Sequence, residues 1–360
     1  MAKMKMKPGV VTGTALQEMF AYLKEEGCAL PAVNVIGSSS INAALQAARE
    51  ASSPIMIQFS NGGGVFNAGK YLDNTNQRAA IAGSVAGALH IWKMAELYGV
   101  PVVLHTDHCA RKLLPWIDGL ITEGEQYYKE KGTPLYSSHM IDLSAEELDE
   151  NIKTSAEYLK RMAKIDMTLE IELGVTGGEE DGVDNTAVDN AKLYTQPEHV
   201  LKAYDALKPI GRFTVAAAFG NVHGVYKPGN VQLHPEILKH SQELVRKERG
   251  LSEEKPLDLV FHGGSGSDIK HIHEALEYGV VKMNIDTDTQ WAFAEPVRKY
   301  MDDNHGYLMS QIGNPEGDDL PNKNKIDPRQ WLVLGEKGMT ARLVQAFKDL
   351  RSYQQFDLGL

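Results

Sequence analysis

Short apolar runs recur along the chain with the length and composition of buried strands. Residues 101–108, PVVLHTDH, begin with an apolar stretch and end in two histidines and an aspartate. A strand that is apolar on both faces is typical of a parallel sheet covered by helices. Eight runs of this kind, rich in Val, Ile, Leu and Phe, lie at residues 29–35, 54–60, 100–107, 135–141, 167–174, 212–220, 258–264 and 280–286.

Helical patterns separate most of these runs. Thr14 with Gln17 and Ser144 with Glu147 have the spacing of capping boxes, and Gly27 has the place of a helix stop. Helices are predicted at residues 14–26, 40–51, 77–98, 145–164, 197–208, 235–249, 268–278 and 339–353.

Eight alternating strand and helix units predict an α/β fold, a (β/α)8 TIM barrel with long inserted loops and extra terminal helices. The insertions are expected at residues 174–195 and 302–338, which are rich in acidic residues and in Pro, Gly, Asn and Asp respectively. Nothing between them resembles a linker, so residues 1–360 are expected to form a single catalytic domain. An open doubly wound sheet is the alternative architecture.

Composition narrows the class of protein. The 360 residues contain 42% hydrophobic and 24% charged residues, with no apolar stretch of about 18 residues that could span a membrane. The formal net charge of -11 argues against binding to nucleic acid or anionic lipid. Cys28 and Cys109 are too few for a disulfide framework, and the basic start lacks an apolar segment after it. We therefore expect a cytoplasmic protein.

Polar residues at the strand ends carry the candidate chemistry, because the carboxyl ends of barrel strands form the active site in this fold. Three imidazoles from three strands, with one position open, make the ligand set of a catalytic zinc ion, and the candidates are His108, His223 and His262. A single histidine of this kind is more often a hydrogen-bonded core residue, but three at equivalent positions favour a metal. Glu172 could approach the metal, whereas Glu170 could orient a histidine or form a structural salt bridge.

Two loops have the composition of phosphate sites. HGGSGSD at 262–268 and NIDTDT at 284–289 each follow a strand and open a helix, where backbone N–H groups attract anions. Loops after strands seven and eight often bind phosphate in such barrels. GVFNAGK at 64–70 matches a nucleotide-binding loop, but Tyr71 replaces the required hydroxyl residue. A phosphorylated substrate is therefore expected, and a nucleotide triphosphatase is disfavoured.

Together these segments resemble a known family. HTDHC, SSHMIDLS, EIELGVTGGEEDGV, AAFGNVHGVY, FHGGSGS, VVKMNIDTDTQWA, GNPEG and DPRQW occur in order between about residues 10 and 350. They resemble the class II, zinc-dependent fructose-bisphosphate aldolases, and most of all the longer subgroup. The resemblance implies a carbon–carbon lyase that reversibly cleaves fructose 1,6-bisphosphate to dihydroxyacetone phosphate and glyceraldehyde 3-phosphate in glycolysis and gluconeogenesis.

Matched by position, the resemblance also implies the roles of individual residues. Asp107 matches the acid/base aspartate, and Glu180 matches the loop glutamate that moves the proton on the carbon beside the ketone. A catalytic Zn²⁺ would be held by His108, His223 and His262, with Glu172 at an alternative metal position. The substrate would be contacted by Asn34, Ser60, Gly224, Gly263, Gly264, Ser265, Asn284, Ile285, Asp286, Thr287 and Arg329.

The resemblance further implies a homodimer, in which Arg329 reaches the neighbouring site, and a monovalent cation, K⁺ or Na⁺, as activator. Two alternatives remain open at this point. The substrate could be another ketose bisphosphate such as tagatose 1,6-bisphosphate, or the protein could be a non-catalytic phosphosugar sensor. A sensor would not need Asp107 and Glu180, which are both present.

Overall fold

The fold was obtained as a computed structural model that describes residues 3–175, 179–180, 183–184, 194–221 and 233–359. Eight parallel strands form a closed barrel, because His105 of the third barrel strand pairs with Ser138 of the fourth and completes the ring. The predicted TIM barrel is confirmed and the open sheet is wrong. The barrel strands are β3 (Leu30–Asn34), β4 (Ile55–Phe59), β5 (Pro101–Thr106), β6 (Ser138–Ile141), β7 (Thr168–Leu173), β10 (Phe213–Ala217), β11 (Leu259–Phe261) and β12 (Val280–Asn284).

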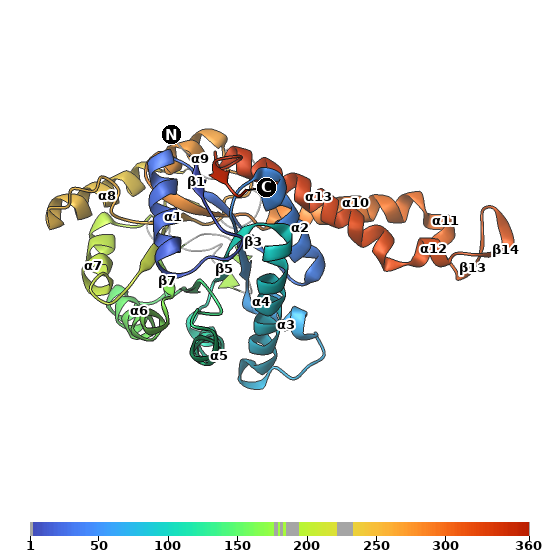
Figure 1. Ribbon diagram of the computed structural model, residues 1–360, viewed down its shortest axis with the longest axis horizontal. Helices are drawn as coiled ribbons and strands as arrows, with labels where there is room; N and C mark the ends of the chain where they lie inside the picture. The colour runs from blue at the N-terminus through green and yellow to red at the C-terminus, as the bar shows by residue number, and fades with distance from the viewer. Residues whose placement is uncertain (1–2, 176–178, 181–182, 185–193, 222–232, 360) are drawn as a thin grey trace.

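Helices surround the barrel (Figure 1). Their bounds agree with most of the predicted segments, and α5 and α3 are additions that the sequence analysis did not predict. α5 places Trp116, Ile117, Leu120 and Ile121 in the core at helical spacing. The helices outside the arm described below are α1 (Gly13–Glu26), α2 (Ser38–Ala51), α3 (Asn61–Ala68), α4 (Arg78–Tyr98), α5 (Leu114–Lys131), α6 (Leu148–Met162), α7 (Pro197–Leu207), α8 (Glu236–Arg249) and α9 (Ile269–Glu277).

Both predicted capping boxes are wrong, because each hydroxyl is engaged elsewhere. Thr14 lies inside α1, and its Oγ1 accepts a hydrogen bond from Arg212 at 3.1 Å. Ser144 lies four positions before Leu148, the first residue of α6, and donates to Oδ1 of Asp142 at 2.7 Å. The predicted stop of α1 is confirmed, since Gly27 has the left-handed conformation (φ 62°) that favours glycine.

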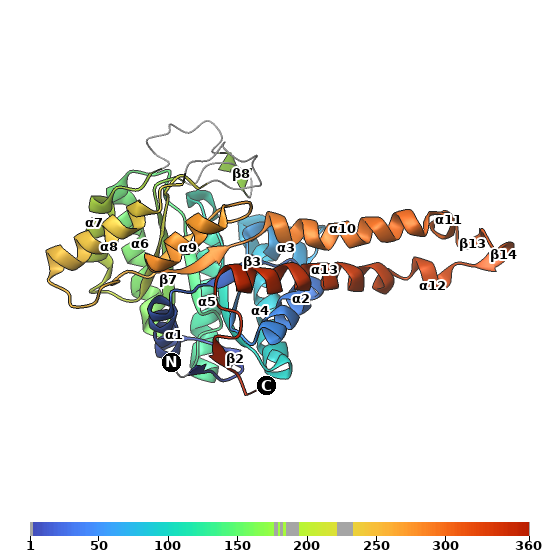
Figure 2. The same cartoon turned by 90° about the horizontal axis from the view of Figure 1, so that it is seen from above.

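A helical arm projects from the barrel (Figures 1 and 2). Its residues 302–338 were predicted to form an inserted loop, but most of them lie in short helices, short strands and the first part of a long helix. Gly335 lets its two long helices approach closely, because a Cβ there would lie 2.5 Å from the Phe293 ring. The arm consists of α10 (Thr287–Asp303), α11 (His305–Leu308), β13 (Ile312–Asn314), β14 (Gly317–Pro321), α12 (Lys323–Ile326) and α13 (Pro328–Asp349).

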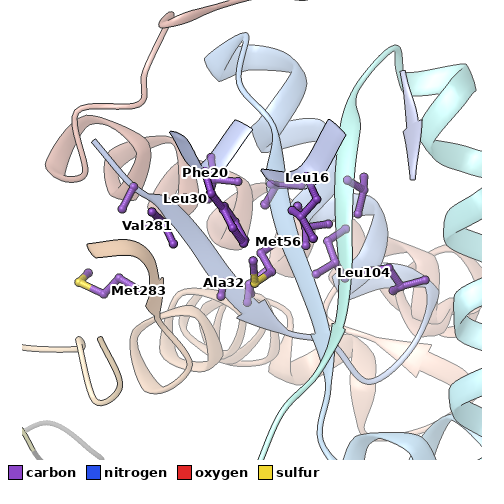
Figure 3. Close-up of a cluster of buried hydrophobic side chains, with 14 of the residues drawn as sticks. Leu16, Phe20, Leu30, Ala32, Met56, Leu104, Val281 and Met283 are labelled. Atoms are coloured by element: carbon purple, nitrogen blue, oxygen red, sulfur yellow. The ribbon is translucent and has the colours of Figure 1, made fainter. Parts of the chain in front are cut away.

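The apolar core fills the barrel and the space between strands and helices. Figure 3 shows one cluster in which side chains of α1 meet side chains of several barrel strands. α1 and the N-terminus lie at one end of the barrel, and β8 lies at the other (Figure 2). Within the described residues, no helix combines the length and apolar character needed to cross a membrane. The labelled members of the cluster are Leu16, Phe20, Leu30, Ala32, Met56, Leu104, Val281 and Met283.

Short strands complete the structure outside the barrel. β2 (Gly9–Val10) pairs with β5, and β1 (Met4–Lys5) pairs with β15 (Phe356–Asp357). β8 (Glu179–Glu180) and β9 (Val183–Asp184) form a small antiparallel hairpin after β7. This hairpin belongs to the insertion predicted at residues 174–195.

Candidate active site

The carboxyl ends of the barrel strands bring the predicted polar residues together. Asp107 and His108 directly follow β5, Glu172 lies in β7, His262 follows β11 and Asn284 ends β12. All eight strands are parallel, so these residues share one end of the barrel.

The potential metal ligands converge in two overlapping groups. Ligand atoms of Asp107, His108 and His262 lie within 4.8 Å of one another, and so do those of His108, Asp142 and Glu172. Nitrogen and carboxylate oxygen atoms at this separation suit a single ion with bonds of about 2.0 to 2.2 Å. The described residues therefore fit a divalent metal. The predicted third imidazole, His223, and its neighbour Gly224 lie outside the described residues.

His108 is held by carboxylates on its Nδ1 side. Its Nδ1 lies 3.1 Å from Oδ2 of Asp142 and 3.5 Å from Oε2 of Glu172. Burial alone would raise the pKa of Asp142, but the hydrogen bond and charge of His108 outweigh burial and lower it below the usual range. Asp142 thus remains ionised and fixes the ring of His108.

His262 lies between two glutamates. Its Nδ1 is 3.1 Å from Oε2 of Glu172, and its Nε2 is 3.0 Å from Oε1 of Glu170. Burial alone would lower the pKa of His262, but the negative charge of Glu172 outweighs burial and raises it to about 9. A metal at this position would replace a proton, because an imidazole ligand must offer a lone pair.

Glu170 combines the two roles between which the sequence left a choice. It contacts His262 as described, and its Oε1 also accepts a hydrogen bond from Nζ of Lys282 at 2.6 Å. Burial would raise the pKa of this carboxyl, but Lys282 and His105 hold it well below its usual value. Glu170 is therefore an ionised carboxylate that forms a salt bridge and touches a candidate metal ligand.

Two amides orient the carboxylate of Asp107. Asn34 and Asn284 each donate a hydrogen bond from Nδ2 over 3.0 Å, to Oδ2 and Oδ1 of Asp107 respectively. Burial alone would raise the pKa of Asp107, but the positive charges of His108 and Lys282 outweigh burial and hold it below its usual range. Asp107 is thus ionised and able to accept a proton from a bound hydroxyl.

The two predicted phosphate loops lie beside each other after neighbouring strands. Gly263 has a positive φ of 62°, and Gly264 donates its N–H to the carbonyl of Asn284 at 3.2 Å. Among the described residues, the buried atoms Ser265 Oγ and Asn284 Oδ1 find no hydrogen-bond partner. Buried polar atoms usually have partners, so these two are suited to bind a ligand. Asp268 caps α9 by accepting a hydrogen bond from the backbone N–H of Lys270 at 2.8 Å.

A cavity of about 680 Å³ opens beside this site. Asn34, Ser60 and Asp286 line it, as the substrate assignment requires, and α10 and α13 contribute Phe293 and Met339. The hydroxyl of Ser60 accepts from the N–H of Gly63 at the start of α3. Because α3 includes residues 64–68, the segment that matched a nucleotide-binding loop is mostly helical.

Two predicted site residues, Glu180 and Arg329, are not seen in this cluster. The backbone of Glu180 belongs to β8, and its side chain lies outside the described structure. Arg329 begins α13 in the projecting arm, where its side chain is 87% exposed and pairs with Asp327. Arg329 thus does not join the site of its own chain. Ile285 and Thr287 continue from Asn284 into α10, as predicted.

Sequence reasoning missed three residues of the site. Asp142 directly follows β6, so the strand-end rule that selected Asp107 could have found it. Lys282 is the one charged residue of the buried strand β12, which is itself a signal of a buried charge pair. Gln58 donates to Oδ1 of Asn34 at 2.6 Å, and no sequence pattern distinguished it.

The chain is similar to proteins of known name over nearly its whole length. The sequence profile of the family "Fructose-bisphosphate aldolase class-II" matches residues 14–355. A fructose-bisphosphate aldolase from Edwardsiella ictaluri is 60% identical over 346 residues, which are 96% of either chain. The class 2 enzyme from Escherichia coli K12 is 58% identical over 349 residues, covering 96% of this chain and 97% of the relative.

Solved structures agree with these similarities. The crystal structure of fructose-bisphosphate aldolase from Campylobacter jejuni superimposes with a TM-score of 0.88 at 55% identity, over 97% of this chain and 98% of that one. The YdjI aldolase from Escherichia coli K12 has a TM-score of 0.66 at 21% identity, over 95% of this chain and 98% of that one, and supports the fold alone.

Proposed function

This chain belongs to the class II fructose-bisphosphate aldolases, and from that premise we propose how its residues perform the reaction. The protein is a carbon–carbon lyase that reversibly cleaves fructose 1,6-bisphosphate to dihydroxyacetone phosphate and glyceraldehyde 3-phosphate. The observation that carries this conclusion is the match of the family over residues 14–355, with its polar residues gathered at one end of the barrel. The names of the relatives support the fructose substrate and not the tagatose epimer.

Membership of this class implies a divalent metal, and we propose that it is zinc. His108, His223 and His262 hold the ion, and Glu172 offers an alternative position. The convergence of the His108, His262 and Glu172 ligand atoms supports this assignment. When bound, zinc supplies a Lewis acid that polarises the ketone of the substrate and balances the negative charge that develops there. Asp142 orients His108 through its Nδ1.

Proton transfer is assigned to two carboxylates. Asp107 accepts the proton of the C4 hydroxyl, the C3–C4 bond breaks and glyceraldehyde 3-phosphate leaves with a new carbonyl at C4. The electron pair of that bond passes to the ketone half of the substrate, and Glu180 delivers a proton to C3 to give dihydroxyacetone phosphate. The ionised state of Asp107 and the two amides that hold it support its role as a base.

The two loops after β11 and β12 bind the phosphate of the dihydroxyacetone half. Ser265 Oγ and Asn284 Oδ1, which lack partners among the described residues, support this assignment. Asn34 and Ser60 contact the sugar chain and the aldehyde half from the adjoining cavity. A K⁺ or Na⁺ ion binds near the backbone carbonyls around His223 and His262 as an activator. The phosphate cradle comprises Gly224, Gly263, Gly264, Ser265, Asn284, Ile285, Asp286 and Thr287.

The working unit is a homodimer in which Arg329 reaches the second phosphate in the neighbouring site. Two observations support this proposal: Arg329 projects on the arm, and large apolar side chains of the arm such as Met309 and Ile312 are 70% and 61% exposed. Exposed apolar surface of this kind is typical of an interface. A cytoplasmic location is supported by the two buried free thiols, Cys28 and Cys109.

Kinetics with the two epimeric sugars test the substrate. The purified enzyme should cleave fructose 1,6-bisphosphate to both triose phosphates with a kcat/KM well above that for tagatose 1,6-bisphosphate. The two sugars differ at one hydroxyl, so the ratio measures how the site recognises that group. A higher kcat/KM for tagatose 1,6-bisphosphate would contradict the assignment.

A further inference from the structure

A lysine that the mechanism does not use is buried near the candidate metal ligands, with Glu170 in contact with both this lysine and His262. Lys282 points inward from β12, and its side chain is 1% exposed. Its Nζ donates to Oε1 of Glu170 at 2.6 Å. A buried ammonium group is costly unless it is paired with an acid. The charged groups that surround Glu170 therefore need an explanation.

Glu170 also contacts two histidines. The same oxygen, Oε1, lies 3.0 Å from Nε2 of His262, and the other oxygen lies 3.5 Å from Nε2 of His105. An ionised carboxylate can only accept hydrogen bonds. Lys282 donates to Oε1 of Glu170, so this oxygen is an acceptor, and Nε2 of His262 carries the hydrogen of the 3.0 Å contact with it.

This arrangement determines which nitrogen of His262 can bind a metal. Nδ1 is the remaining atom, and it faces Oε2 of Glu172 at 3.1 Å. Nδ1 of His108 lies 3.5 Å from the same oxygen. Nδ1 of His262 therefore lies on the side of the ring opposite to Glu170, next to Glu172 and close to His108.

We propose that Lys282 and Glu170 form a positioning pair that sets the metal affinity of the site by holding His262 with its hydrogen on Nε2 and its Nδ1 toward the metal. The proposal rests on the proposed role of His262 as a zinc ligand. Lys282 acts through Glu170 and is not a catalytic residue. Carboxylates that accept from metal-bound histidines typically change metal affinity about 10- to 100-fold when they are lost.

A second buried lysine pair provides the matched control. Lys24 in α1 is also buried, and its Nζ lies 2.9 Å from Oδ1 of Asp258 and 3.1 Å from Oε1 of Glu253. Neither acid belongs to the groups of candidate metal ligands in the described residues. Loss of Lys24 should therefore lower stability without changing metal affinity.

The test measures the zinc dissociation constant of the metal-free protein by competition with a chromophoric chelator. Lys282→Met should weaken zinc binding about 10- to 100-fold, and Lys282→Arg should recover most of the loss because it restores the charge. Lys24→Met should bind zinc like the parent. A folded Lys282→Met protein that binds zinc within about twofold of the parent overturns the proposal.

Three further measurements keep the test decisive. If Lys282→Met fails to fold, Lys282→Met/Glu170→Gln removes both charges together, and unchanged zinc affinity in that protein overturns the proposal. A crystal structure of the zinc-loaded parent should show the metal on Nδ1 of His262, and a metal on Nε2 overturns the proposal without any variant. His262→Ala separates failure of the positioning pair from failure of the metal site itself. If this variant also binds zinc like the parent, the proposed metal site is wrong.

Discussion

Asp107 and His108 are neighbours in the chain but have different partners and different proposed roles. Asn34 and Asn284 hold Asp107, whereas Asp142 holds His108. The two residues follow β5 directly, so a single strand end places the proposed base and a proposed metal ligand within a few ångströms of each other. This division of labour accounts for the pattern HTDH at the end of a buried strand.

The hairpin residue Glu180 is the proposed second proton carrier, and its removal should affect chemistry alone. Glu180→Gln should lower kcat about 10²- to 10⁴-fold, the usual contribution of a general acid or base. Zinc content and the unfolding midpoint should stay unchanged. The neighbouring variant Glu179→Gln serves as the control and should keep nearly full turnover. An unchanged kcat in Glu180→Gln would remove this residue from the mechanism.

His139 makes the fold sensitive to acid. Burial, with a smaller contribution from the charge of His105, lowers the pKa of His139 to about 3. In the unfolded chain the imidazole of His139 takes up a proton near pH 6.5, whereas in the folded protein it stays neutral down to about pH 3. The free energy of unfolding therefore decreases as pH falls from about 6.5 to about 3.

A variant without this imidazole should reveal that loss. The stability advantage of the parent over His139→Gln should narrow by about 2 to 3 kcal/mol between about pH 6 and pH 4, as linkage requires. Denaturant unfolding at several pH values measures the difference. An advantage that stays constant with pH would show that His139 does not titrate in this way.

Residues at strand ends could be predicted because strand direction alone places them together. Asp107, His108 and His262 needed only their position after an apolar run. Lys282 could not be selected in this way, since its role depends on Glu170, which lies 112 positions away in the sequence. The choice between two roles for Glu170 likewise needed the spatial neighbours, which show both contacts.

At the scale of elements, long periodic segments predicted strands and helices correctly, whereas short capping motifs did not predict where helices begin. The eight strands and the C-terminal stop of α1 agree with the structure, because apolar runs and glycine conformations are strong signals. The capping boxes at Thr14 and Ser144 were wrong, because Arg212 and Asp142 compete for these hydroxyls from outside the helix. Residues 302–338 were taken for a loop because they are rich in Pro, Gly, Asn and Asp, yet they include α11, α12 and the first part of α13.

The arm carries the prediction that tests assembly. Asp107→Asn and Arg329→Ala should each lower activity when pure, because each site would lack one residue. After the two proteins are mixed and their subunits exchange, one site of each mixed dimer has both Asp107 and Arg329 intact. Activity of the mixture should therefore exceed that of either variant alone.

The pure variants, treated identically, are the controls for this experiment. Fructose 1,6-bisphosphate cleavage measures the recovery, and light scattering verifies that dimers are present. A mixture that contains mixed dimers but shows no gain would mean that Arg329 acts within its own chain or not at all.

The molecule as a whole combines a barrel that could be predicted from sequence with a site whose residues come from several separate segments of the chain. Eight parallel strands fix one end of the barrel as the place of chemistry, and the family assignment agrees with that scaffold. The metal is the central claim, because the proposed polarisation of the ketone and the proposed positioning of His262 both depend on an ion at this end. Its ligands come from strands that are far apart in sequence.

Cleavage of fructose 1,6-bisphosphate before and after chelation tests this claim most directly. Chelation should abolish activity, and added zinc should restore it in the parent but not in His108→Ala. Full activity without metal, or trapping of the substrate on a lysine by borohydride, would contradict the account.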